Sequence, residues 1–515
     1  MSDQNMFNSN EEKTEKEFEK DILDALPEIP PADILKKVIP CRRAMNFIIA
    51  GFALSTIRID LLWLQFILPL LGFIFLIIGF RTLSYENSWF RLCKISAVVL
   101  NVFNVFDLGI NATVYHETFS ASVYGRSLMV INAFVMILLL IFFAEGLREL
   151  QQKAGIKPHT GFLIMMMLWY FITAFLGFVE AEAGLLGFIF VILYILFLVS
   201  LNKVAKVLYA SGYAIKTMPV KMSDKWIYAI VLSAAVVSIS CGLIFFNSYP
   251  MDWTPVPENE HSEVEDVKAH LLELGFPENV LNDLSDEDIM SCKGALDLTK
   301  KVEELPMNSG REVVEKNPGR ISYSTVYDVK ELVATHILIK LPSDNENKIR
   351  WRVFHYFYWK IDPEFYGTDV MEIWTPKNDV VNSFDITSDI TGRVMYNKDG
   401  QNYSSPYYSV SNKVIVSSFG YARRYENPFL EFSMPKDGDS KRCYLTYEFE
   451  QIGSPVIISC WVNYVHQKNV FMYPVVTASE FRSGGGLSSF NFRGTQTAIQ
   501  VDSDNIHEDM FGSPL

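Results

Sequence analysis

The chain has 515 residues, half of them hydrophobic, and a formal net charge of −14 at pH 7. Its mean hydropathy of +0.15 is high for a chain with 20% charged residues, because long apolar runs fill the first half. A single soluble globule is therefore excluded. The acidic balance argues against binding of nucleic acid, and six cysteines in this length are too few for a disulfide framework.

Residues 1–43 form an arm rich in Glu and Lys. Because the chain opens with acidic and polar residues, we expect no signal peptide here. The composition predicts a solvated cytoplasmic tail with one short polar helix. The alternative is a docking site for a cytosolic partner.

Residues 44–247 contain seven apolar segments, and we predict a transmembrane helical bundle of about seven spans. A span needs about 20 helical residues to cross the ~30 Å hydrocarbon core. Six segments meet or nearly meet that length, whereas the first is short. The predicted spans are Ala44–Ile57, Leu61–Phe80, Ile95–Tyr115, Ser127–Leu147, Gly161–Val179, Gly184–Leu201 and Trp226–Phe246.

Basic residues alternate along these segments. One set of flanks and loops holds fifteen Lys and Arg residues, whereas the other holds Arg58 and Arg126 and then no further basic residue until Lys268. Cytoplasmic loops carry the excess of Lys and Arg. The asymmetry predicts a multi-pass plasma-membrane protein with a cytoplasmic N-terminus and an extracytoplasmic C-terminal half. It also favours Ala44–Ile57 as a full span.

The third predicted span contains four polar residues, Asn101, Asn104, Asp107 and Asn111. At 100° per residue they share a 120° arc of one helix face, which should face the bundle interior. One interpretation is the lining of an ion or proton path, with Asp107 as the charged element. The alternative is interhelical hydrogen bonding, which is favoured because we find no matching charged residue in a second span and no internal repeat.

Residues 248–310 are predicted to be an extracytoplasmic linker followed by a small helical module. Ser262-Glu-Val-Glu265 has the pattern of a capping box, and Ser285 begins a second short helix. We expect further helix to about Leu305. The expected role is that of a structural spacer.

Residues 320–500 consist of short alternating runs separated by turns, which predicts an all-β antiparallel sandwich, jelly-roll-like, of about ten strands. Asp399-Gly400 and Asp437-Gly438 are hairpin-turn signals. Residues 501–515 are predicted to be a disordered tail. The runs include Leu332–Leu341, Lys348–Lys360, Val370–Thr375, Arg393–Asn397, Lys413–Phe419, Phe429–Met434, Cys443–Gln451, Val456–His466 and Val470–Val476.

The strand around Trp351–Trp359 is aromatic on both faces. One face should be core. The other, with Arg352, Tyr356 and Tyr358, is a candidate platform that stacks sugars or peptides, together with Trp374. The alternative is that a helix, a loop or a neighbouring domain covers this face.

Signatures of chemistry are weak in this half. We find no zinc-binding spacing, nucleophile elbow or P-loop, so we predict no metal and no cofactor. Glycosidase chemistry needs at least two carboxylates. Asp385 and Asp389 form one such pair in the sequence, so an enzymatic activity stays open. If the turn at Gly453 closes a hairpin, Cys443 lies opposite Asn463; a disulfide from Cys443 to Cys460 is then disfavoured.

The plan of the chain resembles polytopic membrane proteins of Gram-positive bacteria for which no activity is established. The resemblance implies a bacterial plasma membrane and supplies no site residues. It covers a small part of the chain, in Pro40-Cys-Arg-Arg-Ala-Met45, Leu70–Phe80 with Arg81-Thr-Leu83, and Leu274-Gly-Phe-Pro277.

These patterns favour a non-enzymatic membrane protein, embedded in the lipid bilayer, that displays a β-sandwich outside. The domain would bind or sense an envelope component, a carbohydrate or a protein partner. One alternative is a transporter or ion-coupled protein that uses the polar stripe of the third span. Another is an envelope hydrolase or transferase that acts through carboxylates such as Asp385 and Asp389.

Overall fold

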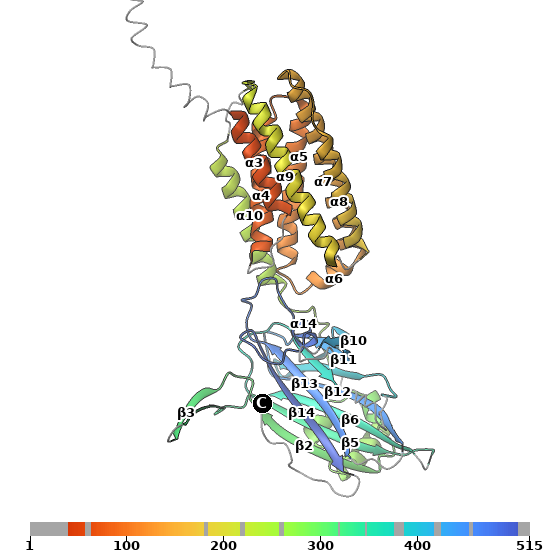
Figure 1. Cartoon of the computed structure of the whole chain (residues 1–515). Coiled ribbons are helices and arrows are strands. Elements are labelled where there is room, and N and C mark those ends of the chain that lie inside the picture. The colour runs from red at the N-terminus through yellow and green to blue at the C-terminus, as the bar shows by residue number, and fades with distance from the viewer. Residues whose placement is uncertain are drawn as a thin grey trace, which may run out of the picture. The chain divides into compact units, whose positions relative to one another are not determined.

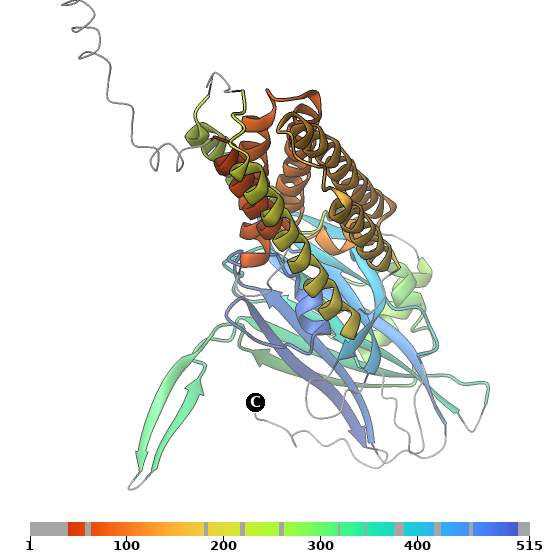
Figure 2. The ribbon, with the colours of Figure 1, turned by 45° about the horizontal axis from the view of Figure 1, so that its top comes forward.

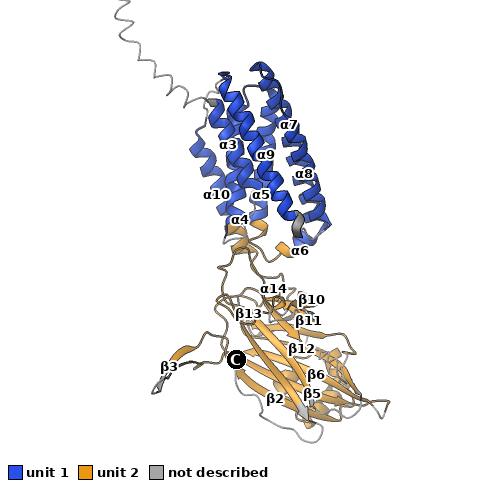
Figure 3. Ribbon diagram, viewed as in Figure 1, with its two compact units in different colours: residues 1–108, 119–238 blue, residues 109–118, 239–515 orange. Residues whose placement is uncertain are grey.

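The computed structural model describes residues 40–56, 63–179, 184–216, 222–256, 262–317, 320–345, 348–374, 386–416, 424–452 and 457–502. The chain divides into two compact units (Figure 3). Unit 1 comprises residues 1–108 and 119–238, and unit 2 comprises residues 109–118 and 239–515. Most of the predicted arm and the predicted tail lie outside the described residues.

The first half is helical, as predicted (Figure 1). Six of its described helices, α4, α5 and α7–α10, are long and apolar enough to cross a membrane, whereas α3 has 17 residues and is shorter. The helices are α3 (Pro40–Thr56), α4 (Leu64–Leu83), α5 (Ser88–Ile110), α6 (His116–Ala121), α7 (Val123–Lys153), α8 (Gly161–Phe178), α9 (Gly184–Ala210) and α10 (Asp224–Phe245).

Within unit 1, α3 packs tightly along α4. Ala44, Ile48 and Phe52 recur every four residues on one face of α3 and are fully buried. A Cβ atom on Gly72 of α4 would lie 2.5 Å from the backbone nitrogen of Ser55, so only glycine permits this approach. Small residues at a helix interface are the usual means of close packing in membranes.

One end of unit 1 gathers charged side chains. Arg43 at the start of α3 donates to Asp224 at the start of α10 over 2.8 Å, and Arg81 near the end of α4 also pairs with Asp224. The buried carboxylate of Glu86 accepts from the backbone nitrogen of Lys216 over 2.8 Å. These contacts place the start of α3 and the end of α4 at the same end of the bundle, which is the relationship of an antiparallel helix pair.

Unit 2 contains two antiparallel sheets and a separate ribbon. The seven-stranded sheet has the order β1-β9-β8-β12-β6-β5-β2, and the five-stranded sheet has the order β10-β11-β7-β13-β14. Figure 2 shows the ribbon β3–β4 extending away from the sheets. The strands are β1 (Thr254–Pro255), β2 (Asp297–Leu305), β3 (Arg311–Asn317), β4 (Arg320–Val326), β5 (Leu332–Leu341), β6 (Lys348–Trp359), β7 (Asp369–Ile373), β8 (Thr391–Lys398), β9 (Gln401–Ser405), β10 (Ser409–Val416), β11 (Arg424–Phe432), β12 (Asp439–Ile452), β13 (Ile457–Gln467) and β14 (Phe492–Asp502).

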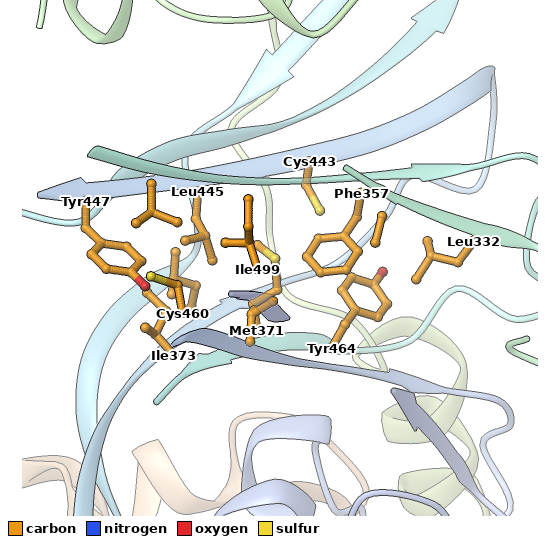
Figure 4. Packing of buried hydrophobic residues seen from close by; sticks show 14 of the residues in the cluster. Leu332, Phe357, Met371, Ile373, Cys443, Leu445, Tyr447, Cys460, Tyr464 and Ile499 are labelled. Carbon is orange, nitrogen blue, oxygen red and sulfur yellow. The ribbon is translucent and has the colours of Figure 1, made fainter. Parts of the chain in front are cut away.

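Both sheets contribute to one hydrophobic core (Figure 4). Phe357 of β6 and Tyr464 of β13 meet there with ring centroids 5.2 Å apart. Cys443 and Cys460 are buried in this core, and both are free thiols. The all-β antiparallel region is thereby confirmed, and a jelly-roll-like connectivity stays a prediction.

The hairpin considered at Gly453 does not form, because the strands on either side of it belong to different sheets. β12 pairs with β6 and β8, whereas β13 pairs with β7 and β14. By contrast, Asp399-Gly400 closes the β8–β9 hairpin as predicted. Lys398 pairs with Gln401 across it, and both turn residues have positive φ, 52° and 79°.

Two predictions of secondary structure are wrong. The stretch expected to continue as helix to Leu305 is strand β2, which pairs with β5 at the edge of the larger sheet. The run Val470–Val476, expected as a strand, forms neither helix nor strand. Tertiary pairing with β5, absent from the local pattern, decides the first outcome.

The small helical module covers the outer face of the larger sheet. It comprises α11 (Ser262–Glu273), α12 (Glu278–Leu281) and α13 (Asp286–Met290). The Ser285 hydroxyl accepts from the backbone nitrogen of Asp288 and caps α13, as predicted. Leu271 and Phe276 of the module pack in one buried cluster with Phe354 and Tyr444 of the sheet.

Candidate functional site

The structure does not assemble the predicted platform on β6. Tyr356 is buried beneath the helical module and donates to Asp283 Oδ2 over 2.8 Å. Arg352 is buried as well and donates to Glu448 Oε1 over 2.7 Å, and Tyr358 is half-buried. The alternative interpretation, a face covered by a neighbouring element, describes these three residues.

Asp283, like Asp288, is a carboxylate of the module that forms hydrogen bonds with the sheet. Its two carboxylate oxygens accept from Arg442 of β12 over 2.6 Å and 2.8 Å, and its backbone oxygen accepts from Arg393 of β8. Burial is the largest cause that raises the pKa of Tyr356, followed by the Asp283 charge beside it. This network is built for intramolecular docking, so it offers no open surface to a ligand.

Trp374, the fourth predicted platform residue, lies elsewhere and is 40% exposed. It directly follows β7, on the outer face of the five-stranded sheet. Its ring lies 6.1 Å from that of half-buried Trp461 of β13, at an interplanar angle of 36°, and its backbone nitrogen donates to the Trp461 carbonyl. Sequence reasoning missed Trp461, although its alternation with buried Val462 already placed it on the outer face.

A polar cluster lies beside this tryptophan pair on the same face. Fully buried Glu372 accepts from Asn427 Nδ2 over 2.7 Å and from Asn463 Nδ2 over 2.8 Å, and it also pairs with Arg482. Asn463 Oδ1 is buried without a hydrogen-bond partner among the described residues. The outer face thus combines two indole rings with amide side chains, one of which, that of Asn463, has an oxygen that accepts no hydrogen bond from the described residues.

Arg482 comes from α14 (Ala478–Ser483), a short helix that the sequence did not reveal. Thr477 and Glu480 form a capping box at its start. The helix covers one part of the outer face, where Ala478 packs with Val370 and Phe492. The part with Trp374 and Trp461 lies outside that apolar cluster.

The sandwich interior holds a second polar group, the histidine pair of β5 and β6. His336 Nδ1 and His355 Nδ1 lie 2.7 Å apart, and both rings are fully buried. The Thr497 hydroxyl donates its proton to Glu303. The hydroxyl oxygen therefore accepts the 2.9 Å hydrogen bond from His336, whose Nε2 must carry the proton. His336 Nδ1 must then accept from His355, which leaves His355 Nε2 as a buried acceptor without a partner among the described residues.

Three of the four residues of the predicted stripe lie on α5. Asn101 is 6% exposed, and its Oδ1 and the Nδ2 of Asn104 are buried without hydrogen-bond partners among the described residues. Asp107 is exposed on the surface of the protein chain. The helix ends at Ile110, whose carbonyl accepts from Thr113, so Asn111 lies beyond the predicted face and belongs to unit 2.

The remaining candidates for chemistry are the carboxylates Asp385 and Asp389. Asp389 is exposed, and Asp385 lies outside the described residues. Over the described part of the chain, no group of three or more His, Cys, Asp or Glu side chains is arranged to hold a metal ion.

Comparison with known proteins adds little. No family model matches the chain, and no curated protein matches it. A solved structure on "pH-induced modulation of Streptococcus parasanguinis adhesion by Fap1 fimbriae" is 11% identical, with 41% of this chain and 100% of that chain covered and a TM-score of 0.17. A score this low carries no inference about fold or function.

Proposed function

We propose that the protein is a multi-pass protein of a bacterial plasma membrane that binds an envelope carbohydrate with its extracytoplasmic β domain. The binding face is the outer face of the five-stranded sheet around Trp374 and Trp461. The observation that carries the proposal is this tilted, partly exposed tryptophan pair beside the amide side chain of Asn463.

The chemistry of the face suits a sugar better than a metal or a charged cofactor. Indole rings present flat apolar surfaces with a polar edge, which stack on the carbon–hydrogen faces of pyranose rings. Asn463 and Glu372 are buried and Glu372 is already engaged by Asn427, Asn463 and Arg482, so the indole rings carry the contact with the sugar and the polar cluster holds the sheet beneath them.

The proposed topology has seven spans, with the N-terminus in the cytoplasm. Support comes from the pairing of Asp224 with both Arg43 and Arg81, which places the start of α3 at the same end of the bundle as the end of α4. Reporter fusions at each terminus of the full chain test the topology. An N-terminal reporter active only in the cytoplasm and a C-terminal one active only outside are expected; the same side for both would refute it.

Binding is tested with the full-length protein in nanodiscs, titrated calorimetrically with soluble fragments of bacterial wall glycans. Trp374→Ala and Trp461→Ala should each weaken binding by about tenfold or more, as for a central interface aromatic. Tyr323→Ala is the matched control, because Tyr323 is 67% exposed on the β3–β4 ribbon. Equal affinity for all four proteins would end the proposal.

Amide atoms of Asn101 and Asn104 are buried with no hydrogen-bond partner in the described part of the chain, which favours a second candidate, an ion-coupled membrane protein. In this account the two amides hold a water molecule or an ion in α5, with Asp107 nearby on the same helix. Proton or cation flux into vesicles that contain the full chain should then fall in Asp107→Asn. Absence of flux in the unmodified protein would remove this candidate.

A further inference from the structure

Two phenylalanines of unit 2 stand out among its exposed side chains. Phe471 is 82% exposed and belongs to the apolar run Val470–Val476, which forms neither helix nor strand. Phe490, on the Gly-rich loop after α14, is 79% exposed. A single exposed apolar side chain needs no explanation, but adjacent ones on fixed loops mark an interaction surface.

The two loops are held together by one side chain. Asn469 Nδ2 donates to the Phe490 carbonyl over 3.2 Å, and Asn469 Oδ1 accepts from the Phe471 backbone nitrogen over 3.1 Å. The backbone nitrogen of Lys468 donates to Asn491 O over 2.8 Å. The backbones at Phe471 and Phe490, 19 positions apart in the sequence, are thereby held next to each other.

The loop that carries Phe471 also contacts the ends of two apolar helices inside unit 2. The backbone nitrogen of Val475 donates over 2.9 Å to the carbonyl of Asn111, the residue after α5. Val475 also packs with Val114 and with Tyr249, which follows α10 by four residues. Phe471 precedes Val475 by four residues, so its backbone lies at most about 14 Å from this point.

We propose that Phe471 and Phe490 insert into the interfacial region of the bilayer that holds the helices of this protein. α5 and α10 end where a span must leave the membrane, and the loop is attached to those ends. Aromatic side chains are enriched at this depth. Insertion goes no deeper than the headgroup boundary, about 5–10 Å, because the loop backbone lacks the internal hydrogen bonds that hydrocarbon demands.

This contact gives the β domain an attachment to the membrane in addition to its covalent connections. It explains why an apolar run that has the composition of a strand joins neither sheet. The inference does not depend on the carbohydrate proposal. It concerns the loop that follows β13, whereas Trp461 lies within the strand, six residues before its end.

The test is the immersion depth of nitroxide labels in vesicles of phosphatidylethanolamine and phosphatidylglycerol. The full-length Cys241→Ala protein is the background, because Cys241 is exposed and the other five cysteines are buried. Labels are placed singly at Phe471→Cys, Phe490→Cys and Leu296→Cys. The Leu332 end of β5 pairs with Trp359, whose ring contacts His466 just before the Phe471 loop. Leu296 is 59% exposed and its backbone nitrogen donates to Lys340 near the other end of β5, so it is the distant control.

Collisions with oxygen, which concentrates in the bilayer, should exceed collisions with a water-soluble nickel complex several-fold at 471 and 490, and the reverse should hold at 296. Asn469→Ala should reduce the contrast at 490, because it releases that loop from its neighbour. Nickel collisions that dominate at all three positions would overturn the proposal and indicate a surface for a soluble partner.

Discussion

His336 and His355 face each other across β5 and β6 with their Nδ1 atoms 2.7 Å apart, inside the core of the sandwich. Burial lowers the pKa of His336 from 6.5 to about 3, with a further contribution from the charge of Lys301, and burial lowers the pKa of His355 as well. Two neutral imidazoles in a hydrogen-bonded chain are therefore the folded-state form.

This pair predicts that unit 2 loses stability in acid. The unfolded chain binds protons at these histidines below pH 6.5, whereas folded His336 does so only near pH 3, so the free energy of unfolding falls as the pH drops through this window. For His336 alone the loss is about 2 kcal/mol between pH 8 and pH 5.

Hydrogen exchange of the β5 and β6 amides in the full-length protein measures this effect. The dependence of the opening free energy on pH should become shallower in His336→Gln, even if that variant is less stable at every pH. Ile339→Val changes a buried side chain of β5 that does not titrate, and it should lower stability while keeping the original slope. A slope unchanged in His336→Gln would show that the pair does not titrate on unfolding.

The ion pair of Asp283 and Arg442 should stabilise the docked helical module. Arg442→Met leaves a buried carboxylate without its bidentate partner, a loss that costs about 3–5 kcal/mol. Lys398→Met removes a cation from an exposed pair with Asp437 and should cause no measurable change. Amide exchange in α11–α13 reports both effects; equal exchange in the two variants would contradict the assigned role of Asp283.

Gly72 should be required for the close contact of α3 and α4. The methyl group of Gly72→Ala would meet the backbone of Ser55, so the helices must separate at a cost of about 1–3 kcal/mol. Gly177→Ala in α8 is the matched control, because among the described residues no heavy atom outside the local turn of α8 lies within 4 Å of its added Cβ. Thermal unfolding in detergent should separate the two variants, and equal midpoints would argue against the packing.

Helix positions in the membrane half were predictable because hydrocarbon imposes a simple rule on composition. Gly161–Val179 was predicted and α8 spans Gly161–Phe178. The ends were less predictable: α7 runs from Val123 to Lys153, well beyond the apolar Ser127–Leu147. An apolar run marks only the part of a helix that lies in hydrocarbon. The helix itself extends beyond that part through polar residues, which the apolar run does not reveal.

Strands rich in aliphatic and β-branched residues were also predictable, and Leu332–Leu341 coincides with β5. Strand β2 was not, because Asp297–Leu305 contains Lys and Glu residues that suit a helix. Its backbone forms hydrogen bonds with β5 at the edge of the larger sheet. An exposed edge strand can carry charged side chains. Local propensity carries no information about such a partner.

The candidate site was predicted in part. Period two on β6 identified two aromatic faces, but the cover over Tyr356 comes from Asp283 and the rest of the module, some 70 residues earlier in the chain. Trp374 was singled out, whereas its neighbour Trp461 was not, since β7 and β13 are distant in sequence and pair only in the fold. Sequence patterns place residues on faces, and topology decides which faces meet.

The central claim is that Trp374 and Trp461 form the carbohydrate-binding face. The most direct test is fluorine NMR of the full-length protein labelled with 5-fluorotryptophan, with resonances assigned by single Trp→Phe replacements. Addition of wall glycan fragments should shift the Trp374 and Trp461 resonances and leave that of Trp351 in place. Unchanged resonances for both residues, or shifts confined to other tryptophans, would contradict the account.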